Sequence, residues 1–329
     1  MTQSKRISYL IMVALLVAIG WFHIGTMVLT AFFGYFALQK FSFGRSKILG
    51  AAIYLISVAA IGYGLFFFSS RAYKTLPEIA EKTIPAVVGF AERKGIELPF
   101  TDYASLKSVA IKKVREKVAN VGHYAQETFF QLALLVIGLI VALSLFLNTR
   151  WNSENDPNAV RDSVYATVVS ELVLRFETFY LSFAKVMGAQ IIISGINTVL
   201  TAIFLFWNGF PYTTVLIVLT FLCGLIPIIG NILCNTLIVC VGFTISPNMA
   251  LAALIFLIVI HKLEYFLNSK IIGDRIKNPM WLTLVGIVLG EKLMGIPGVI
   301  LAPVVLHYIK VEASRSKLAD VTPGAARTA

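Results

Sequence analysis

The feature that most constrains the fold is a stretch from Val186 to His261 that contains no Asp, Glu, Lys or Arg. One helical crossing of a bilayer takes about 20 apolar residues, so this stretch can supply about three or four crossings. Further uncharged stretches cover 7–39, 48–70 and 128–149. The whole chain is 14% charged, whereas soluble domains carry roughly 25%. We therefore predict an all-α polytopic membrane protein with about eight hydrophobic segments.

Charged residues separate the apolar segments and divide the chain into six regions. In chain order we expect N-terminal membrane segments (1–70), an extracytoplasmic amphipathic helical region (71–127), a membrane span (128–149), a cytoplasmic amphipathic helix (150–187), a C-terminal transport membrane domain (188–310) and a cytoplasmic tail (311–329). The apolar run Ile7–Gln39 has no good cleavage site, so we interpret it as a retained anchor. Gly20, His23 and Gly25 near its middle indicate a tight helical hairpin or a broken helix.

Two of the polar regions have the pattern of amphipathic helices. In the first, after Pro99, apolar residues recur at helical spacing among lysines and arginines. This helix packs either on other helices of the protein or on a membrane surface. The second helix begins after Asp156, where the next residue is proline. We expect its valines and aromatic residues on one face and charged residues such as Glu171 and Arg175 elsewhere.

The distribution of lysine and arginine predicts the topology, because short basic loops stay in the cytoplasm. The short basic segments are the N-terminus, 40–47, 150–185, 262–277 and the C-terminal tail. If all are cytoplasmic, Thr213–Ile245 and Met280–Lys310 are both helix-break-helix hairpins, which open from opposite faces. The alternative makes each a single kinked span, with the basic 268–279 loop outside.

Glycine and proline interrupt both of these long segments. The first break reads Gly224-Leu-Ile-Pro227-Ile-Ile-Gly230-Asn231, and the second reads Gly290-Glu-Lys-Leu-Met-Gly295-Ile-Pro297-Gly298. Backbone polar groups freed at a break are not tolerated in lipid, so they must face protein or water. Paired interrupted segments often mark a transport site. The alternative is that Pro227 and Pro297 only kink packed helices.

Ionisable residues at membrane depth are costly and are often functional. Glu264 stands at the end of an apolar run, and is either a transport carboxylate or an interfacial residue paired with Lys262 or Arg275. Glu291 stands at the turn of the last hairpin, where it is either deep or locally paired and exposed. A carboxyl group in a low-dielectric site holds its proton more tightly than in water. We therefore expect Glu264 to carry protons, acting together with the second break.

The residues that we assign to the transport pathway are the polar and break-forming ones of the C-terminal half. They are Gln190, Gly224, Pro227, Gly230, Asn231, Glu264, Asn268, Gly273, Glu291, Gly295, Pro297 and Gly298. For the uncharged polar side chains among them, hydrogen bonding between helices is the alternative role.

Several function classes are disfavoured. The net charge of +11 fits the cytoplasmic flanks of membrane segments better than nucleic-acid binding. Cys223, Cys234 and Cys240 lie in apolar stretches and match no zinc motif. The sequence has no H-E-x-x-H, G-x-S-x-G or Walker A motif. We expect neither enzymatic activity, nor a cofactor, nor a metal site.

A set of motifs in the C-terminal half resembles a known family. The motifs are, in order, Gly188-Ala-Gln190, Gly224–Gly230, Glu264-x-x-x-Asn268-x-Lys270-Ile-Ile-Gly273, Pro279 and Gly295-Ile-Pro297-Gly298 running on to Ala302-Pro303. Together they resemble the autoinducer-2 exporter family of bacterial permeases, with the N-terminal third matching in layout only. Ser269-Lys270 departs from the family's usual proline after the asparagine, and the loop 274–278 is unusually charged.

The resemblance implies a multi-pass transporter of the bacterial inner membrane that assembles as a homo-oligomer. It implies a small solute or ion as substrate, through export of an autoinducer-2-like signal or cation/proton antiport. A passive channel and a non-transporting membrane scaffold are the alternatives. Coupled flux in vesicles favours the transporter, ohmic current the channel, and no flux under any gradient the scaffold.

Overall fold

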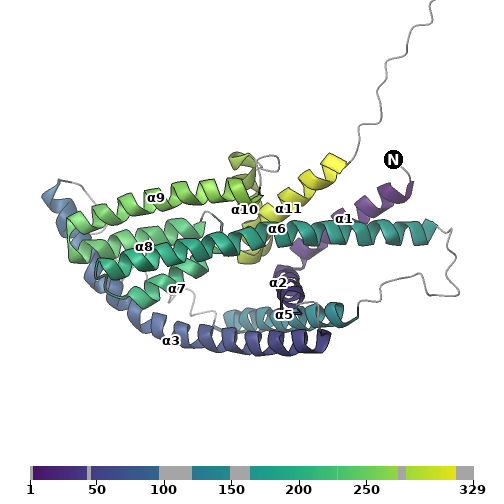
Figure 1. Ribbon diagram of the computed structural model, residues 1–329, viewed down its shortest axis with the longest axis horizontal. Helices are drawn as coiled ribbons and strands as arrows, with labels where there is room; N and C mark the ends of the chain where they lie inside the picture. The colour runs from purple at the N-terminus through teal and green to yellow at the C-terminus, as the bar shows by residue number, and fades with distance from the viewer. Residues whose placement is uncertain are drawn as a thin grey trace, which may run out of the picture.

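The computed structural model describes residues 3–42, 46–95, 121–148, 164–227, 229–272 and 279–315, and its regular elements in these ranges are all α-helices. The helices are α1 (Gln3–Trp21), α2 (Gly25–Phe41), α3 (Lys47–Arg93), α5 (Val121–Leu147), α6 (Val164–Trp207), α7 (Thr213–Gly224), α8 (Ile229–Ile245), α9 (Pro247–Ile272), α10 (Met280–Met294) and α11 (Ile296–Arg315) (Figure 1).

The predicted fold class is confirmed. Within the described residues, 6 helices are long and apolar enough to cross a membrane. Two shorter apolar helices, Thr213–Gly224 and Gly230–Ile245, bring the hydrophobic segments to the expected number. The amphipathic helix expected after Pro99 lies outside the described residues.

The N-terminal apolar run is a broken helix. The break falls at 22–24, where His23 has a φ of 53°, a left-handed conformation that is uncommon for residues other than glycine. From there the two helices take different partners, since α1 packs along α6 and α2 packs against α5. Gln131 of α5 and Thr26 of α2 are hydrogen-bonded at 2.5 Å.

Helix α3 continues past the expected region boundary at Ser70 and runs unbroken through Pro77 and Pro85. Its first half packs on α2 and α5, and Figure 1 shows it continuing from there toward α7 and α8. At that end the Tyr212 hydroxyl donates a hydrogen bond of 3.0 Å to Glu78, and Lys82 forms an ion pair of 2.9 Å with the same carboxylate. One rigid element therefore connects the N-terminal helices to the α7–α8 pair.

Helix α6 likewise crosses an expected boundary, at residue 187, without interruption. Its buried face differs from the predicted one. Arg175 is only 2% exposed, whereas Phe176, which was expected on the apolar face, is 42% exposed. The reason is that α6 packs its polar residues against α1 and α11 and leaves several apolar residues on the outside, as a membrane protein can.

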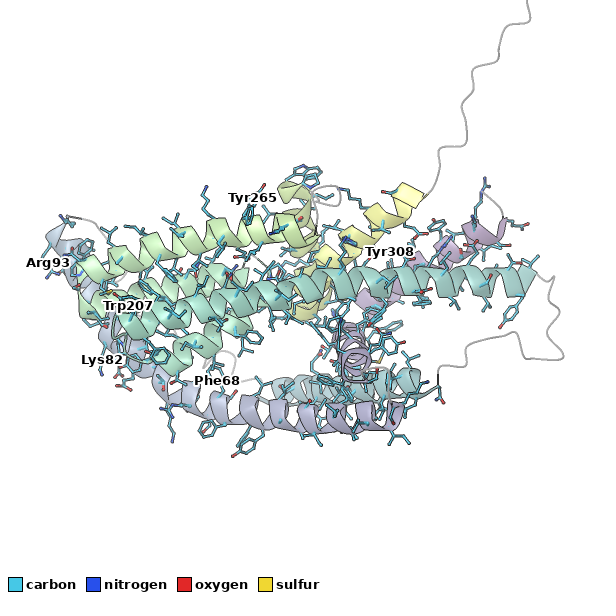
Figure 2. The ribbon with its side chains drawn as sticks, viewed as in Figure 1. Phe68, Lys82, Arg93, Trp207, Tyr265 and Tyr308 are labelled. Carbon is cyan, nitrogen blue, oxygen red and sulfur yellow. The ribbon has the colours of Figure 1, made fainter. Side chains whose placement is uncertain are left out.

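Two hydrophobic clusters share α6. One joins α3, α6, α7, α8 and α9 through Ile79, Leu205, Leu216, Ile238 and Leu257. The other joins α1, α6 and α11 through residues that include Met12, Phe183 and Val304. In Figure 2, Trp207 at the end of α6 lies at the same end of the molecule as Lys82 and Arg93 of α3, whereas Tyr308 of α11 lies in the other half.

The end of α3 offers a test of topology. Gly95 follows α3 with a φ of +67°, is exposed, and has open space around it. We expect an epitope tag inserted there to be cleaved by external protease in intact cells, because 71–127 is predicted to be extracytoplasmic. A tag fused to the C-terminus should stay protected in the same cells. Cleavage of the second tag and protection of the first would contradict this topology.

Candidate transport site

The candidate site begins with three polar side chains on one face of α6. Gln190, Ser194 and Asn197 follow each other at helical spacing, so they line one side of the helix. The Gln190 amide donates a hydrogen bond of 2.5 Å to the carbonyl of Gly224, and the Ser194 hydroxyl donates one of 2.8 Å to the carbonyl of Phe221. The last carbonyls of a helix lack partners within it. Helix α6 thus supplies donors to the backbone that ends α7.

Two glycines allow the helices to approach closely at this first break. A Cβ atom on Gly224 would collide with the Ser194 side chain, and one on Gly230 would collide with the carbonyl of Cys223. Pro227 lies between them, in the break that separates α7 from α8. The glycine and proline residues singled out from the sequence therefore form a tight helix-break-helix pair.

A carboxylate completes the cluster. Asn231, in the first turn of α8, donates from its amide nitrogen to both oxygens of Glu264 on α9, at 2.9 and 2.7 Å. The Asn197 side chain of α6 is a further polar neighbour of Glu264. The side chain of Glu264 is 13% exposed. Helices α6 and α8 thus place two side-chain amides beside a mostly buried carboxyl group on α9.

The structure describes few basic groups near Glu264, and Arg275, one of its two expected partners, lies outside the described residues. Within the described part of the chain, no lysine or arginine forms an ion pair with Glu264, and the nearest basic group is His261, whose Nδ1 lies 4.0 Å away on a 69% exposed side chain. The Oδ1 atom of Asn197 is buried and lacks a hydrogen-bond partner among those same residues. Buried polar groups normally have partners, and buried charges are normally paired. This arrangement suits a site that takes up a proton or a cation.

The second break has different neighbours. Gly295 adopts a φ of +64° between α10 and α11, and Gly290 and Gly298 bring the two helix backbones into contact. A Cβ atom on Gly25 would lie 3.2 Å from the Pro297 Cβ. The second break therefore packs against the break between α1 and α2. Glu291 is 52% exposed and lies 3.6 Å from Lys292, so it is locally paired and exposed.

The structure divides the predicted pathway residues into two groups. Six of them meet around the first break: Gln190, Gly224, Pro227, Gly230, Asn231 and Glu264. Glu291, Gly295, Pro297 and Gly298 belong to the second break. The structure brings Asn231 to Glu264, because α8 and α9 pack side by side. Joint action of Glu264 with the second break stays a prediction; Ile226 of the first break packs against the cluster of Ile287, Val299 and Ala302 on α10 and α11. Asn268 continues α9, its side chain lies outside the described residues, and so does Gly273.

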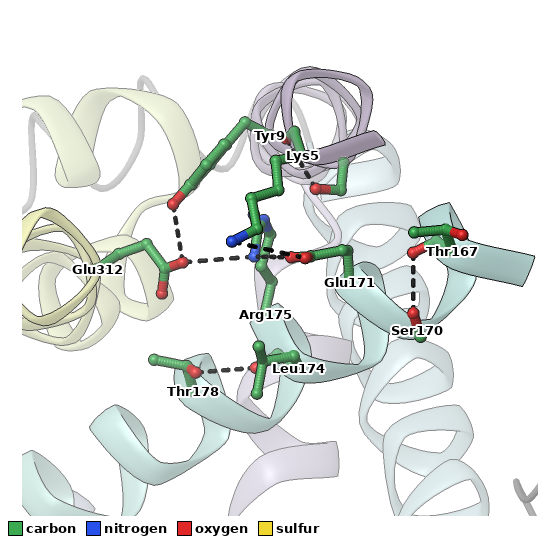
Figure 3. A network of polar contacts seen from close by, with 10 residues as sticks. Lys5, Tyr9, Thr167, Ser170, Glu171, Leu174, Arg175, Thr178 and Glu312 are labelled. Atoms are coloured by element: carbon green, nitrogen blue, oxygen red, sulfur yellow. Dashed lines mark hydrogen bonds and ion pairs between the residues drawn. The ribbon is translucent and has the colours of Figure 1, made fainter. Parts of the chain in front are cut away.

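A second polar cluster, which no sequence motif indicated, joins three helices (Figure 3). Arg175 of α6 forms ion pairs with Glu171 at 3.2 Å and with Glu312 of α11 at 3.4 Å. Its guanidinium carbon lies 3.9 Å from the ring centroid of Tyr9 on α1. The Tyr9 hydroxyl donates a hydrogen bond of 2.9 Å to Glu312. We call these four residues the Arg175 junction.

Apolar helices sufficient for several crossings, broken helices and a mostly buried carboxylate among them are the features of a multi-pass membrane transporter. Residues 4–314 match the family model of AI-2E family transporters. The chain belongs to this family, which confirms the resemblance drawn from its motifs and makes it a transporter rather than an enzyme.

A curated relative is similar over part of its length. It is the "Putative transport protein YdbI" of Bacillus subtilis (strain 168), which is 26% identical over 194 residues. The matched region is 55% of this chain and 55% of the relative, so the chain spans about half the length of the relative that it matches.

Proposed function

We propose that the protein is a proton-coupled secondary transporter in which Glu264 is the coupling carboxylate. The observation that carries this proposal is the environment of Glu264. Its carboxyl group is mostly buried, receives hydrogen bonds from a neutral amide, and has only an exposed histidine as a basic neighbour in the described structure. An ionised carboxylate there is costly unless a proton or a cation neutralises it. Alternating binding of a proton and of a cation at the same carboxylate is the elementary step of antiport.

We further propose that the first break lines the substrate path. Gln190 and Asn231 hold the backbone of α7 and the Glu264 carboxylate, respectively. A small solute or ion that displaces these hydrogen bonds would gain access to carbonyl and amide groups without meeting lipid. A small cation exchanged for protons, or an exported autoinducer-2-like solute, fits this polar lining. The family membership supports a bacterial inner-membrane location and a homo-oligomer.

Proteoliposomes containing a pH-sensitive dye test the coupling. We expect external Na⁺ or Li⁺ to change the internal pH when the parent protein is present. Glu264→Gln retains the shape and the hydrogen-bonding capacity but cannot ionise, so this response should disappear from mildly acidic to mildly alkaline pH. Glu264→Asp retains the carboxyl group and should keep a reduced response.

Glu81→Gln is the matched control, because it removes an exposed carboxylate on α3, outside the residues assigned to the pathway. It should exchange ions as the parent does. A parent-like response of Glu264→Gln at every pH would show that the carboxylate is structural. If the parent protein exports the autoinducer-2 signal and shows no ion response, the substrate is the solute and not a cation.

A further inference from the structure

The Arg175 junction is a buried, incompletely satisfied meeting point of three helices. Arg175 is 2% exposed on its side chain, and Glu312 is 11% exposed. Even so, the Nε atom of Arg175 and the Oε2 atom of Glu312 are buried without a hydrogen-bond partner among the described residues. A fully satisfied arginine–carboxylate pair would be bidentate, with two parallel hydrogen bonds. Here each carboxylate offers one oxygen to one nitrogen of the guanidinium group.

The contacts are also longer than those of a strong pair. The two nitrogen–oxygen distances are 3.2 and 3.4 Å, whereas strong charge-assisted hydrogen bonds measure about 2.7–2.9 Å. Each buried group without a partner raises the free energy of the state that contains it. The junction in this state is therefore weaker than these four residues could make it. Such weakness is expected of a contact that has to open.

Opening of the junction would affect both the second break and the candidate transport site, because its residues lie on the helices that lead to them. Glu312 lies in the last turns of α11, the second arm of the second break, and Tyr9 lies on α1, which leads to the break that packs against Pro297. Arg175 lies on α6, which carries the donors of the candidate transport site. Packed interfaces between helices tend to have two discrete arrangements rather than a continuous range.

We propose that the Arg175 junction is a conformational latch, which holds α1 and α11 against α6 in one state of the protein and opens in another. In the open state, Arg175 keeps its contact with Glu171 on the same helix and releases Glu312 and Tyr9. Movement of α11 then carries the second break with it, independently of which solute is transported.

Electron–electron distance measurements test the latch without any assumption about substrate. Spin labels are attached to single cysteines at Ser170 on α6 and Ile309 on α11, both exposed, after replacement of the native cysteines. In lipid nanodiscs the parent should show a short distance, and Glu312→Gln should increase the population of a longer distance severalfold. Tyr9→Phe removes only the hydroxyl group and should shift the populations in the same direction to a smaller extent.

Two controls separate opening of the latch from other changes. Glu177→Gln removes an exposed carboxylate from the same helix and should leave the distances unchanged. A label pair at Ser170 and Leu181, both on α6, should report one distance in every variant. If the α6–α11 pair shows one and the same distance in the parent, Glu312→Gln and Tyr9→Phe, the junction is a permanent joint and the proposal is overturned. If Glu312→Gln does not fold, the parent and Tyr9→Phe decide in the same way.

Discussion

Replacing Gly298 by alanine should separate α10 from α11 and abolish transport. A Cβ atom on Gly298 would overlap the carbonyl oxygen of Gly290 on the facing helix, so backbone, not a flexible side chain, has to move. Overpacking of a well-packed contact costs about 1–3 kcal/mol, and small residues are what allow membrane helices to approach closely. Thermal unfolding of the detergent-purified protein should show a lower midpoint, and the proteoliposomes should show no ion response.

The contact is reciprocal, which gives the experiment an internal check. A Cβ atom on Gly290 would overlap the carbonyl of Gly298, so Gly290→Ala should cause the same loss. Gly62→Ala on α3 is the control, because nothing lies near its Cβ position. Alanine there should stabilise the helix by roughly 0.5–1 kcal/mol. Parent-like stability and transport of Gly298→Ala would show that the two helices do not touch at this point.

Replacing Arg175 by methionine should destabilise the protein by about 3–5 kcal/mol, as expected when one partner of a buried ion pair is removed. Methionine keeps the stem of the side chain but leaves the carboxylates of Glu171 and Glu312 without their shared cation. The loss comes from these stranded charges, so it is compatible with a latch of moderate strength. Thermal unfolding in detergent measures it.

Neutralising the stranded carboxylates should restore most of the stability. The triple variant Arg175→Met, Glu171→Gln, Glu312→Gln removes the uncompensated charges together. Lys5→Met is a milder comparison, since Lys5 is half exposed and lies 4.0 Å from Glu171. An exposed pair of this kind contributes at most about 1 kcal/mol. Equal stability of the single and triple variants would refute the assigned role of the charges.

The sequence predicted the local features of the candidate site but not all of its contacts. The breaks follow from Gly224, Pro227 and Gly230, whose effects on the backbone are local. Glu264 follows from its place at the end of an apolar run. The spacing of Asn231 and Glu264 along the chain also indicates their pairing. The two residues lie nearly equally far from the turn at Ser246, so an α8–α9 hairpin brings them together.

The Arg175 junction could not be predicted in the same way. Glu312 is distant in sequence, and its contact with Arg175 depends on how α6 and α11 are rotated against each other. That rotation is fixed by the apolar cluster around Phe183 and Val304, which forms only after three helices meet. The helical spacing of Gln190 and Asn197, in contrast, is a local property of the sequence that puts both on one face of α6.

The length of α3 has a practical consequence. Its 47 residues correspond to roughly 70 Å measured along a curved helix at about 1.5 Å per residue, whereas the hydrocarbon core of a bilayer is about 30 Å thick. The helix is therefore longer than one crossing needs, and the half that carries Glu78, Lys82 and Arg93 packs against α7 and α8 through its apolar side and presents exposed charged side chains on its other side. An antibody fragment raised against it would be rigidly attached to the transmembrane helices. Such a fragment would serve as a fiducial mark for aligning particle images of a protein that has few other features outside a micelle.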